Sequence, residues 1–145
     1  MKEKKENELP SPPDNLTSMF AQGWIGLAFW MSFGLLIEGL IAFRIPAYLQ
    51  DPVRRELFRL GHAHGTLLSI VLLIVGLYAH TAIVAPMRIA RLALQAGVIM
   101  MPVGFILGGI SHFESDPNPL VFLAPLGGLL VIFGVVSIAV TILKK

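Results

Sequence analysis

Long apolar runs dominate the chain and predict four membrane-spanning helices. They cover residues 19–43, 60–85, 92–111 and 120–143. About 20 apolar helical residues are enough to cross the roughly 30 Å hydrocarbon core of a bilayer. Continuous runs disfavour a transmembrane barrel, whose strands would alternate over about 10 residues. The pattern therefore predicts an all-α integral membrane protein, a four-transmembrane-helix bundle with both termini on one side.

Polar residues are confined to the ends of the chain and to the connections between the runs. Residues 1–18 combine Lys, Glu and Pro and are predicted to be a disordered tail in front of a membrane domain at 19–145. Residues 44–59 are predicted to lie at the headgroup level with a short amphipathic helix, where Tyr48 suits the interface. In the third run, the spacing of Gly104 and Gly108 predicts a close helix contact.

Composition and charge narrow the class of protein further. The chain is 55% hydrophobic and 14% charged, whereas soluble domains are about 25% charged, so a water-soluble core is excluded. It has no cysteine and a net charge of +2, which removes thiolate ligands and gives no support to nucleic-acid binding. No nucleophile and base pair or phosphate-binding glycine loop is present, so a conventional hydrolase or kinase is not expected.

The distribution of basic residues predicts the orientation. The side that holds the termini carries seven of them, against four on the other side, and cytoplasmic segments are enriched in Lys and Arg. Both termini are therefore predicted to be cytoplasmic, in the plasma (inner) membrane. Without the three lysines of the tail the comparison becomes four against four, which leaves dual topology open. The seven are Lys2, Lys4, Lys5, Arg88, Arg91, Lys144 and Lys145; the four are Arg44, Arg54, Arg55 and Arg59.

Four ionisable side chains near one end of the spans are the candidate site: Glu38, His62, His64 and His112. Ionisable groups in membrane spans are costly and therefore mark functional sites. Residues two apart on a helix point about 200° apart, so His62 and His64 cannot both face one interior. His62 shares its direction with Ser69 and is predicted to face inward. His64 shares its side with Leu68 and is predicted to face lipid or another subunit.

Two cofactor classes suit these side chains. A transition metal needs three or four ligands, which Glu38, His62 and His112 could supply. Haem b needs an axial histidine, His62 or His64, with Met101 or a second histidine opposite. In the alternative without a cofactor, the histidines form hydrogen bonds to a neighbouring helix, to Glu38 or to lipid phosphates.

The segment from Arg54 to Leu68, with Phe43 to Leu49 before it, resembles a type of small uncharacterised bacterial four-helix membrane protein in which a His-x-His element opens a span. That element is similar to the haem-binding helices of haem–copper oxidase subunit one. The resemblance implies a link to haem or copper. Four histidines cannot hold two haems and a copper site, so an autonomous oxygen reductase is not expected.

The function expected from the sequence is that of a structural or accessory membrane subunit, with other subunits or further copies of the chain as partners, that binds haem or a transition metal at one membrane face. It is not expected to be an enzyme on its own. The alternative is a small proton-coupled transporter that uses Glu38, because a lone acidic residue in the first of four spans is also the arrangement of small multidrug-resistance transporters. The remainder of that pattern is missing here.

Overall fold

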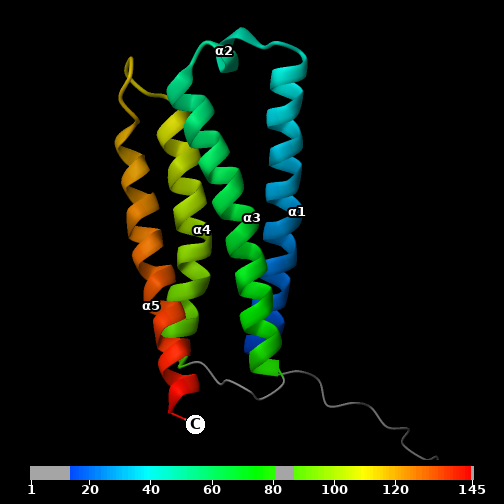
Figure 1. Ribbon diagram of the computed structural model, residues 1–145, viewed down its shortest axis with the longest axis vertical. Coiled ribbons are helices and arrows are strands. Elements are labelled where there is room, and N and C mark those ends of the chain that lie inside the picture. Colours follow the sequence, from blue (N-terminus) through cyan, green and yellow to red (C-terminus); the bar gives the residue numbers. More distant parts are fainter. Residues whose placement is uncertain (1–13, 81–86, 145) are drawn as a thin grey trace, which may run out of the picture.

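The computed structural model describes residues 14–80 and 87–144, and nearly all of them are helical (Figure 1). Four of the helices are long and apolar enough to cross a membrane. The prediction of an all-α chain with four such helices is confirmed. The elements are α1 (Asp14–Ala42), α2 (Pro46–Leu49), α3 (Pro52–His80), α4 (Arg88–Ile110), the 3₁₀ helix η1 (Pro119–Phe122) and α5 (Leu123–Leu143).

The four long helices stand side by side in the order α1, α3, α4, α5 (Figure 1). Helix α3 packs against both α1 and α4, and α5 packs principally against α4. Successive long helices run in opposite directions, so α1 begins and α5 ends at the same end of the molecule (Figure 1). We call this the terminal end and the opposite end the loop end. In this arrangement α3 has two covered sides.

Three predicted starts differ from the structure. Helix α4 begins at Arg88, four residues before the predicted start of the third span, and the predicted end of the second span, at residue 85, lies outside the described residues. Helix α1 begins at Asp14, inside the stretch predicted to be disordered, whereas residues 1–13 lie outside the described residues. Helix α3 begins at Pro52, eight residues before the predicted start of the second span. Asp51 explains this early start, because its Oδ1 accepts a hydrogen bond of 2.8 Å from the backbone N–H of Arg54, as an N-cap does, and proline suits the first helical position. Hydropathy alone missed these charged first turns.

The contact between α4 and α5 depends on small residues. A Cβ atom added to Gly104 would collide with the backbone of Ala124 of α5, and one added to Gly108 would lie 2.8 Å from Cβ of Val121 in η1, directly before α5. The close helix contact predicted from the spacing of these two glycines is therefore confirmed. Between α3 and α4, Leu68, Leu72, Leu94 and Val98 form the main apolar core together with Met19 of α1.

Candidate functional site

His62 lies between α3 and α1, where two glycines allow the helices to interlock. Its imidazole rests on Gly34 of α1, where an added Cβ would collide with the ring. In the opposite direction, the Trp30 indole lies across Gly65 of α3 and is only 6% exposed. The inward direction predicted for His62 is confirmed, and its stripe partner Ser69 is fully buried.

The hydrogen bond that His62 makes determines which of its nitrogens is free. Its Nδ1 lies 2.8 Å from the backbone carbonyl oxygen of Trp30. A carbonyl can only accept, so Nδ1 carries the proton and, in the neutral ring, Nε2 keeps its lone pair. Within the described part of the chain, Nε2 has no hydrogen-bond partner. This tautomer is the one that metal-ligating histidines commonly adopt.

His62 lines an open groove at the loop end, between α1 and α3. The groove has a volume of about 360 Å³. It contains two carboxylates, Glu38 and Glu56, and one guanidinium, Arg59, and all three residues are exposed. No hydrogen bond or ion pair joins Glu38 to another residue that the structure describes. We call it the His62 groove; its remaining lining residues are Gly34, Ile37, Leu60 and Ala63.

The outward direction predicted for His64 is wrong. Its ring lies 5.1 Å from the ring of Phe105 of α4, centroid to centroid, and its neighbour on that side, Leu68, is buried. The 200° separation from His62 is real, but α3 is covered on both sides, so the opposite direction leads to α4 rather than to lipid. Nδ1 of His64 lies 2.8 Å from the Leu60 carbonyl oxygen of its own helix, which again assigns the proton to Nδ1.

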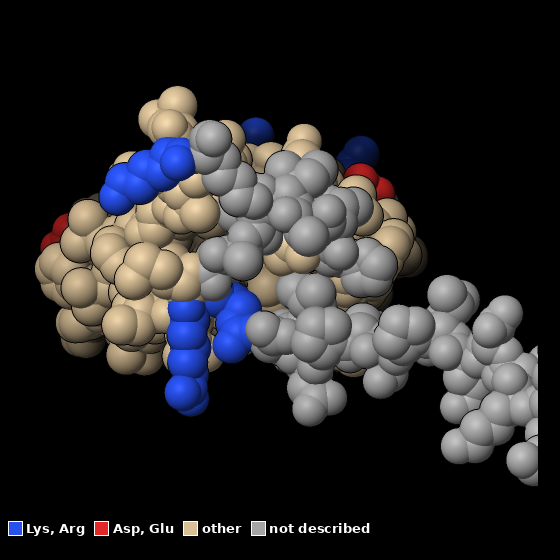
Figure 2. Space-filling view, turned by 90° about the horizontal axis from the view of Figure 1, so that it is seen from below, with Lys and Arg blue, Asp and Glu red and all other residues tan. Residues whose placement is uncertain are grey.

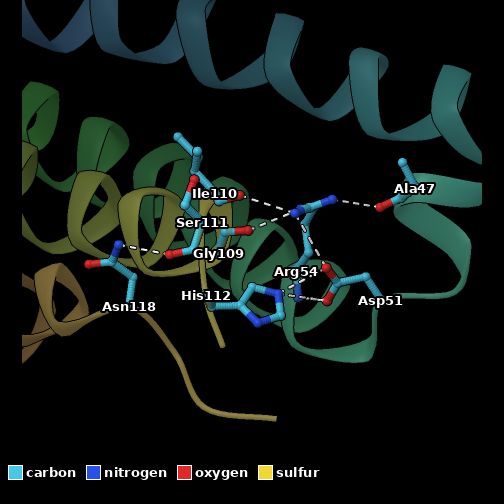
Figure 3. Close-up of polar contacts among 8 residues, drawn as sticks. All are labelled: Ala47, Asp51, Arg54, Gly109, Ile110, Ser111, His112 and Asn118. Carbon is cyan, nitrogen blue, oxygen red and sulfur yellow. Dashed lines mark hydrogen bonds and ion pairs between the residues drawn. The ribbon is translucent and has the colours of Figure 1, made fainter. Parts of the chain in front are cut away.

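His112 belongs to a separate cluster at the loop end. Its Nε2 lies 3.0 and 2.9 Å from the two carboxylate oxygens of Asp51, and its side chain is 7% exposed (Figure 3). The structure therefore does not bring Glu38, His62 and His112 together as the predicted metal site. Among the residues that the structure describes, no three His, Asp or Glu side chains are placed to hold a metal ion.

Arg54 connects this cluster to the end of α4. Its Nε and Nη2 donate to the carbonyl oxygens of Gly109 and Ile110, each over 3.0 Å, and its Nη1 donates to the Ala47 carbonyl oxygen over 2.7 Å (Figure 3). The last carbonyls of a helix lack partners within the helix and carry its negative dipole end. The guanidinium therefore caps α4 and ties the connection between α1 and α3 to it. We call Asp51, Arg54 and His112 the loop-end clamp.

The clamp also sets the ionisation of Asp51. Burial acts to raise the pKa of this carboxyl, but the hydrogen bonds from the Arg54 backbone and from His112, together with the charge of Arg54, outweigh it and lower the pKa below its ordinary value of 3.8. A group with a lowered folded pKa stabilises the fold fully above its unfolded pKa and loses that contribution as the pH falls through the folded one. The clamp is therefore intact at neutral pH and weakens only below about pH 4.

Several residues of these two sites were missed from the sequence. Glu56 and Arg59 were assigned to a connecting loop, whereas they lie on the first turns of α3 and line the His62 groove. Tyr48, which suited the membrane interface, belongs to neither site; it is 2% exposed, and burial raises the pKa of its hydroxyl. The Asp51-Pro52 pair was the available signal, since Asp before Pro is a typical helix start.

Met101, considered as a second haem ligand, faces α5 rather than either histidine. Its backbone lies against Gly127, and its Sδ would lie 3.8 Å from a Cβ added to Gly128.

Comparisons with known protein families, with curated proteins and with solved structures found no match to this chain. The candidate function therefore depends on the geometry of the His62 groove.

Proposed function

We propose that the protein is a small integral membrane subunit of the plasma (inner) membrane, with four spans and cytoplasmic termini, that binds haem b through His62. The four long apolar helices support the membrane location. Large apolar side chains of α1 and α5 are exposed, among them Leu35 at 70% and Leu129 at 63%, and need lipid or partner subunits to cover them. An accessory role in a larger assembly uses these same faces.

The observation that carries the haem proposal is the unpaired Nε2 of His62 in the His62 groove. The Trp30 carbonyl orients the ring through Nδ1, which also raises the basicity of a ligating imidazole. At Gly34 of α1 the absence of a side chain leaves room for the ring, since an added Cβ would collide with it. An axial ligand that is oriented in this way and open on one side suits a flat cofactor that approaches from the groove.

The arrangement favours haem over a bare metal ion. A bound transition metal ion takes three or four protein ligands, and the described residues offer no such group. Haem brings four nitrogen ligands of its own and needs one or two axial ligands from protein. Arg59, in the same groove, supplies a cation suited to a haem propionate.

The test is an absorption spectrum, with haem and metal analysis, of the full chain purified from haem-supplemented cells. We expect a Soret band that is lost in His62→Ala and retained in His64→Ala, because His64 faces α4. Gly34→Ala should lower haem affinity by about 10- to 100-fold, the usual cost of disturbing the residues that orient a ligand. Gly39→Ala is the matched control, since an added Cβ there meets nothing within 4 Å.

The opposite results would overturn the haem proposal. A colourless, metal-free wild type in haem-supplemented cells would leave only the accessory role. A Soret band that survives His62→Ala and disappears in His64→Ala would move the site to the side of α3 that faces α4. If Gly34→Ala and Gly39→Ala lowered haem affinity equally, the orientation of the His62 ring against α1 would not contribute to haem binding.

The second candidate function is proton-coupled transport through Glu38. The observation in its favour is that Glu38 has no partner among the described residues and lines the same groove as His62. In proteoliposomes with a pH gradient, Glu38→Gln should abolish proton-coupled uptake or efflux of small cations, because the amide carries no exchangeable charge. Glu56→Gln, in the same groove, is the matched control. Unchanged transport in Glu38→Gln would exclude this function.

A further inference from the structure

A second cavity lies between α1 and α4, over the middle of α3, and is separate from the His62 groove. Its volume is about 390 Å³. Because α1 and α4 each pack on α3, a trough remains between them over Gly26 and Ser69. It lies well inside the long apolar helices and is lined almost entirely by apolar groups. We call it the apolar trough; it is lined by Gln22, Ile25, Gly26, Phe29, Trp30, Ser69, Val98, Ile99 and Val103.

The polar side chains of Ser69 and Gln22 at the trough are already paired within the protein. The Ser69 hydroxyl donates to the Gly65 carbonyl oxygen over 2.7 Å. Gln22 and Gln95 bridge α1 and α4 toward the terminal end, with Nε2 of Gln22 donating to the Gln95 carbonyl oxygen over 2.7 Å and Nε2 of Gln95 donating to Oε1 of Gln22 over 3.0 Å. The trough therefore offers no free polar side chain to a ligand and suits an apolar occupant. In a bilayer, the groups available to fill it are the hydrocarbon chains of lipids.

Arg91 lies beyond the glutamine bridge toward the terminal end. Its Nε and Nη1 are buried and have no hydrogen-bond partner among the described residues. Arg91 as a whole is partly exposed, but leaving two buried guanidinium N–H groups unpaired is costly, and an anion that accepts from them recovers that cost. Lys and Arg side chains stand out in the foreground of the described surface at this end, and Asp and Glu are seen only at its left and right edges (Figure 2). Arg91 therefore has the charge and the setting to receive an anion.

One stripe of α4 joins the unpaired cation to the apolar trough. Arg91 and Gln95 are four residues apart and so share a face, and Gln95 contacts α1. Val98, Ile99 and Val103 continue this face along the trough. From Arg91 to Val103 the rise is about 18 Å, at 1.5 Å per residue. Along this stripe the lining changes from a guanidinium to amides to apolar side chains. This order complements the phosphate, the ester groups and the acyl chain of an anionic phospholipid whose headgroup lies at the terminal end.

We infer that the face between α1 and α4 is a binding site for one anionic glycerophospholipid, with its phosphate at Arg91 and an acyl chain in the apolar trough. Charge complementarity selects the headgroup, since basic pockets between helices at the cytoplasmic side bind anionic headgroups. The position of the trough well inside the spans and its apolar lining favour an acyl chain as its occupant. Its lining includes Trp30, whose carbonyl oxygen orients His62, but none of the side chains proposed to bind haem, so lipid binding is measured without haem.

The test is native mass spectrometry of the delipidated full chain in a neutral detergent, titrated with phosphatidylglycerol or phosphatidylcholine. We expect phosphatidylglycerol to bind more tightly, and Arg91→Gln to weaken it by about tenfold, the scale of a hydrogen bond to a charged group. Arg88→Gln is the matched control, with the same charge change on an exposed neighbour; it should cost less than about fivefold, the scale of one basic residue near a membrane surface. Arg91→Lys keeps the charge and should preserve the preference.

The trough is tested by a side chain that fills it. Ile99→Trp should weaken the binding of both lipids, because Ile99 lines the trough. Since Ile99 is 53% exposed, the larger indole ring can fill the trough without repacking the core. Ile132→Trp, at a similarly exposed position on α5, should change neither affinity. Thermal unfolding of each variant confirms that it is folded.

Three results would overturn the proposal. Equal losses in Arg91→Gln and Arg88→Gln would indicate general surface charge rather than a site. Unchanged lipid affinities in Ile99→Trp would show that no acyl chain occupies the trough. Stabilisation by inorganic phosphate alone, to the same extent as by phosphatidylglycerol and lost in Arg91→Gln, would make the ligand free phosphate instead of a lipid.

Discussion

Arg54→Met is expected to lower the free energy of unfolding by about 2–4 kcal/mol, because it removes three charged hydrogen bonds at once and leaves the last carbonyls of α4 without a partner. The Gly109 and Ile110 carbonyl oxygens then lose their cap, and Asp51 keeps His112 but loses its guanidinium at 3.4 Å. The effect should be measured by SDS titration in mixed micelles, followed by circular dichroism.

Arg55→Met is the matched control, since it removes the same charge from the next position on α3. Arg55 is exposed and its guanidinium makes one hydrogen bond, of 3.1 Å, to the Leu49 carbonyl oxygen. Its loss should cost about 0.5 kcal/mol or less, as for an ordinary surface substitution. Equal costs for the two variants would mean that the loop-end clamp does not hold α4, and that only the total charge of the loop end matters.

Gly127→Ala is expected to lower the free energy of unfolding by about 3 kcal/mol and to loosen α5, because the new methyl group has no room. An added Cβ would collide with the Met101 backbone N and lie 2.9 Å from its Cα. A flexible side chain could move aside, but a helix backbone cannot, so the two helices must separate. The measurement is the same SDS titration, with proteolysis of the connection between α4 and α5 as a second readout.

The neighbouring glycine separates packing from helix propensity. At Gly128 an added Cβ meets only the end of the Met101 side chain, Sδ at 3.8 Å and Cε at 3.9 Å, which are ordinary contacts. Gly128→Ala should therefore leave stability unchanged or raise it by up to about 1 kcal/mol, since alanine favours the helix more than glycine does. If Gly127→Ala were as harmless as Gly128→Ala, the close packing of α4 on α5 would not contribute to stability.

Hydropathy predicted the spans well because the thickness of the bilayer sets the minimum length of apolar sequence that a spanning helix needs. All four runs became helices, with ends that differ most where charged residues begin α3. A window that counts apolar residues cannot register the cap that Asp51 provides. That early start moved Glu56 and Arg59 from a loop onto a helix, and with them half of the polar lining of the His62 groove.

The candidate site was predicted only in part. Glu38 and His62 do line one groove, as their matching depth indicated, whereas His112 pairs with Asp51 in a different cluster. Depth along a helix follows from residue number, but the side to which a residue points has meaning only when the neighbours of the helix are known. Asp51, the partner of His112, lies 61 residues away in the chain, and no local pattern joins them.

The sequence by itself determined the class of fold, the four spans, the glycine contact between α4 and α5, and the opposite directions of His62 and His64, because each follows from composition or from helical periodicity. Only the tertiary structure decided where those directions lead. With α3 placed between α1 and α4, His62 meets the Trp30 carbonyl and His64 meets Phe105, so both rings are covered by neighbouring helices. The order in which helices pack depends on long-range contacts, which the period of one helix does not contain.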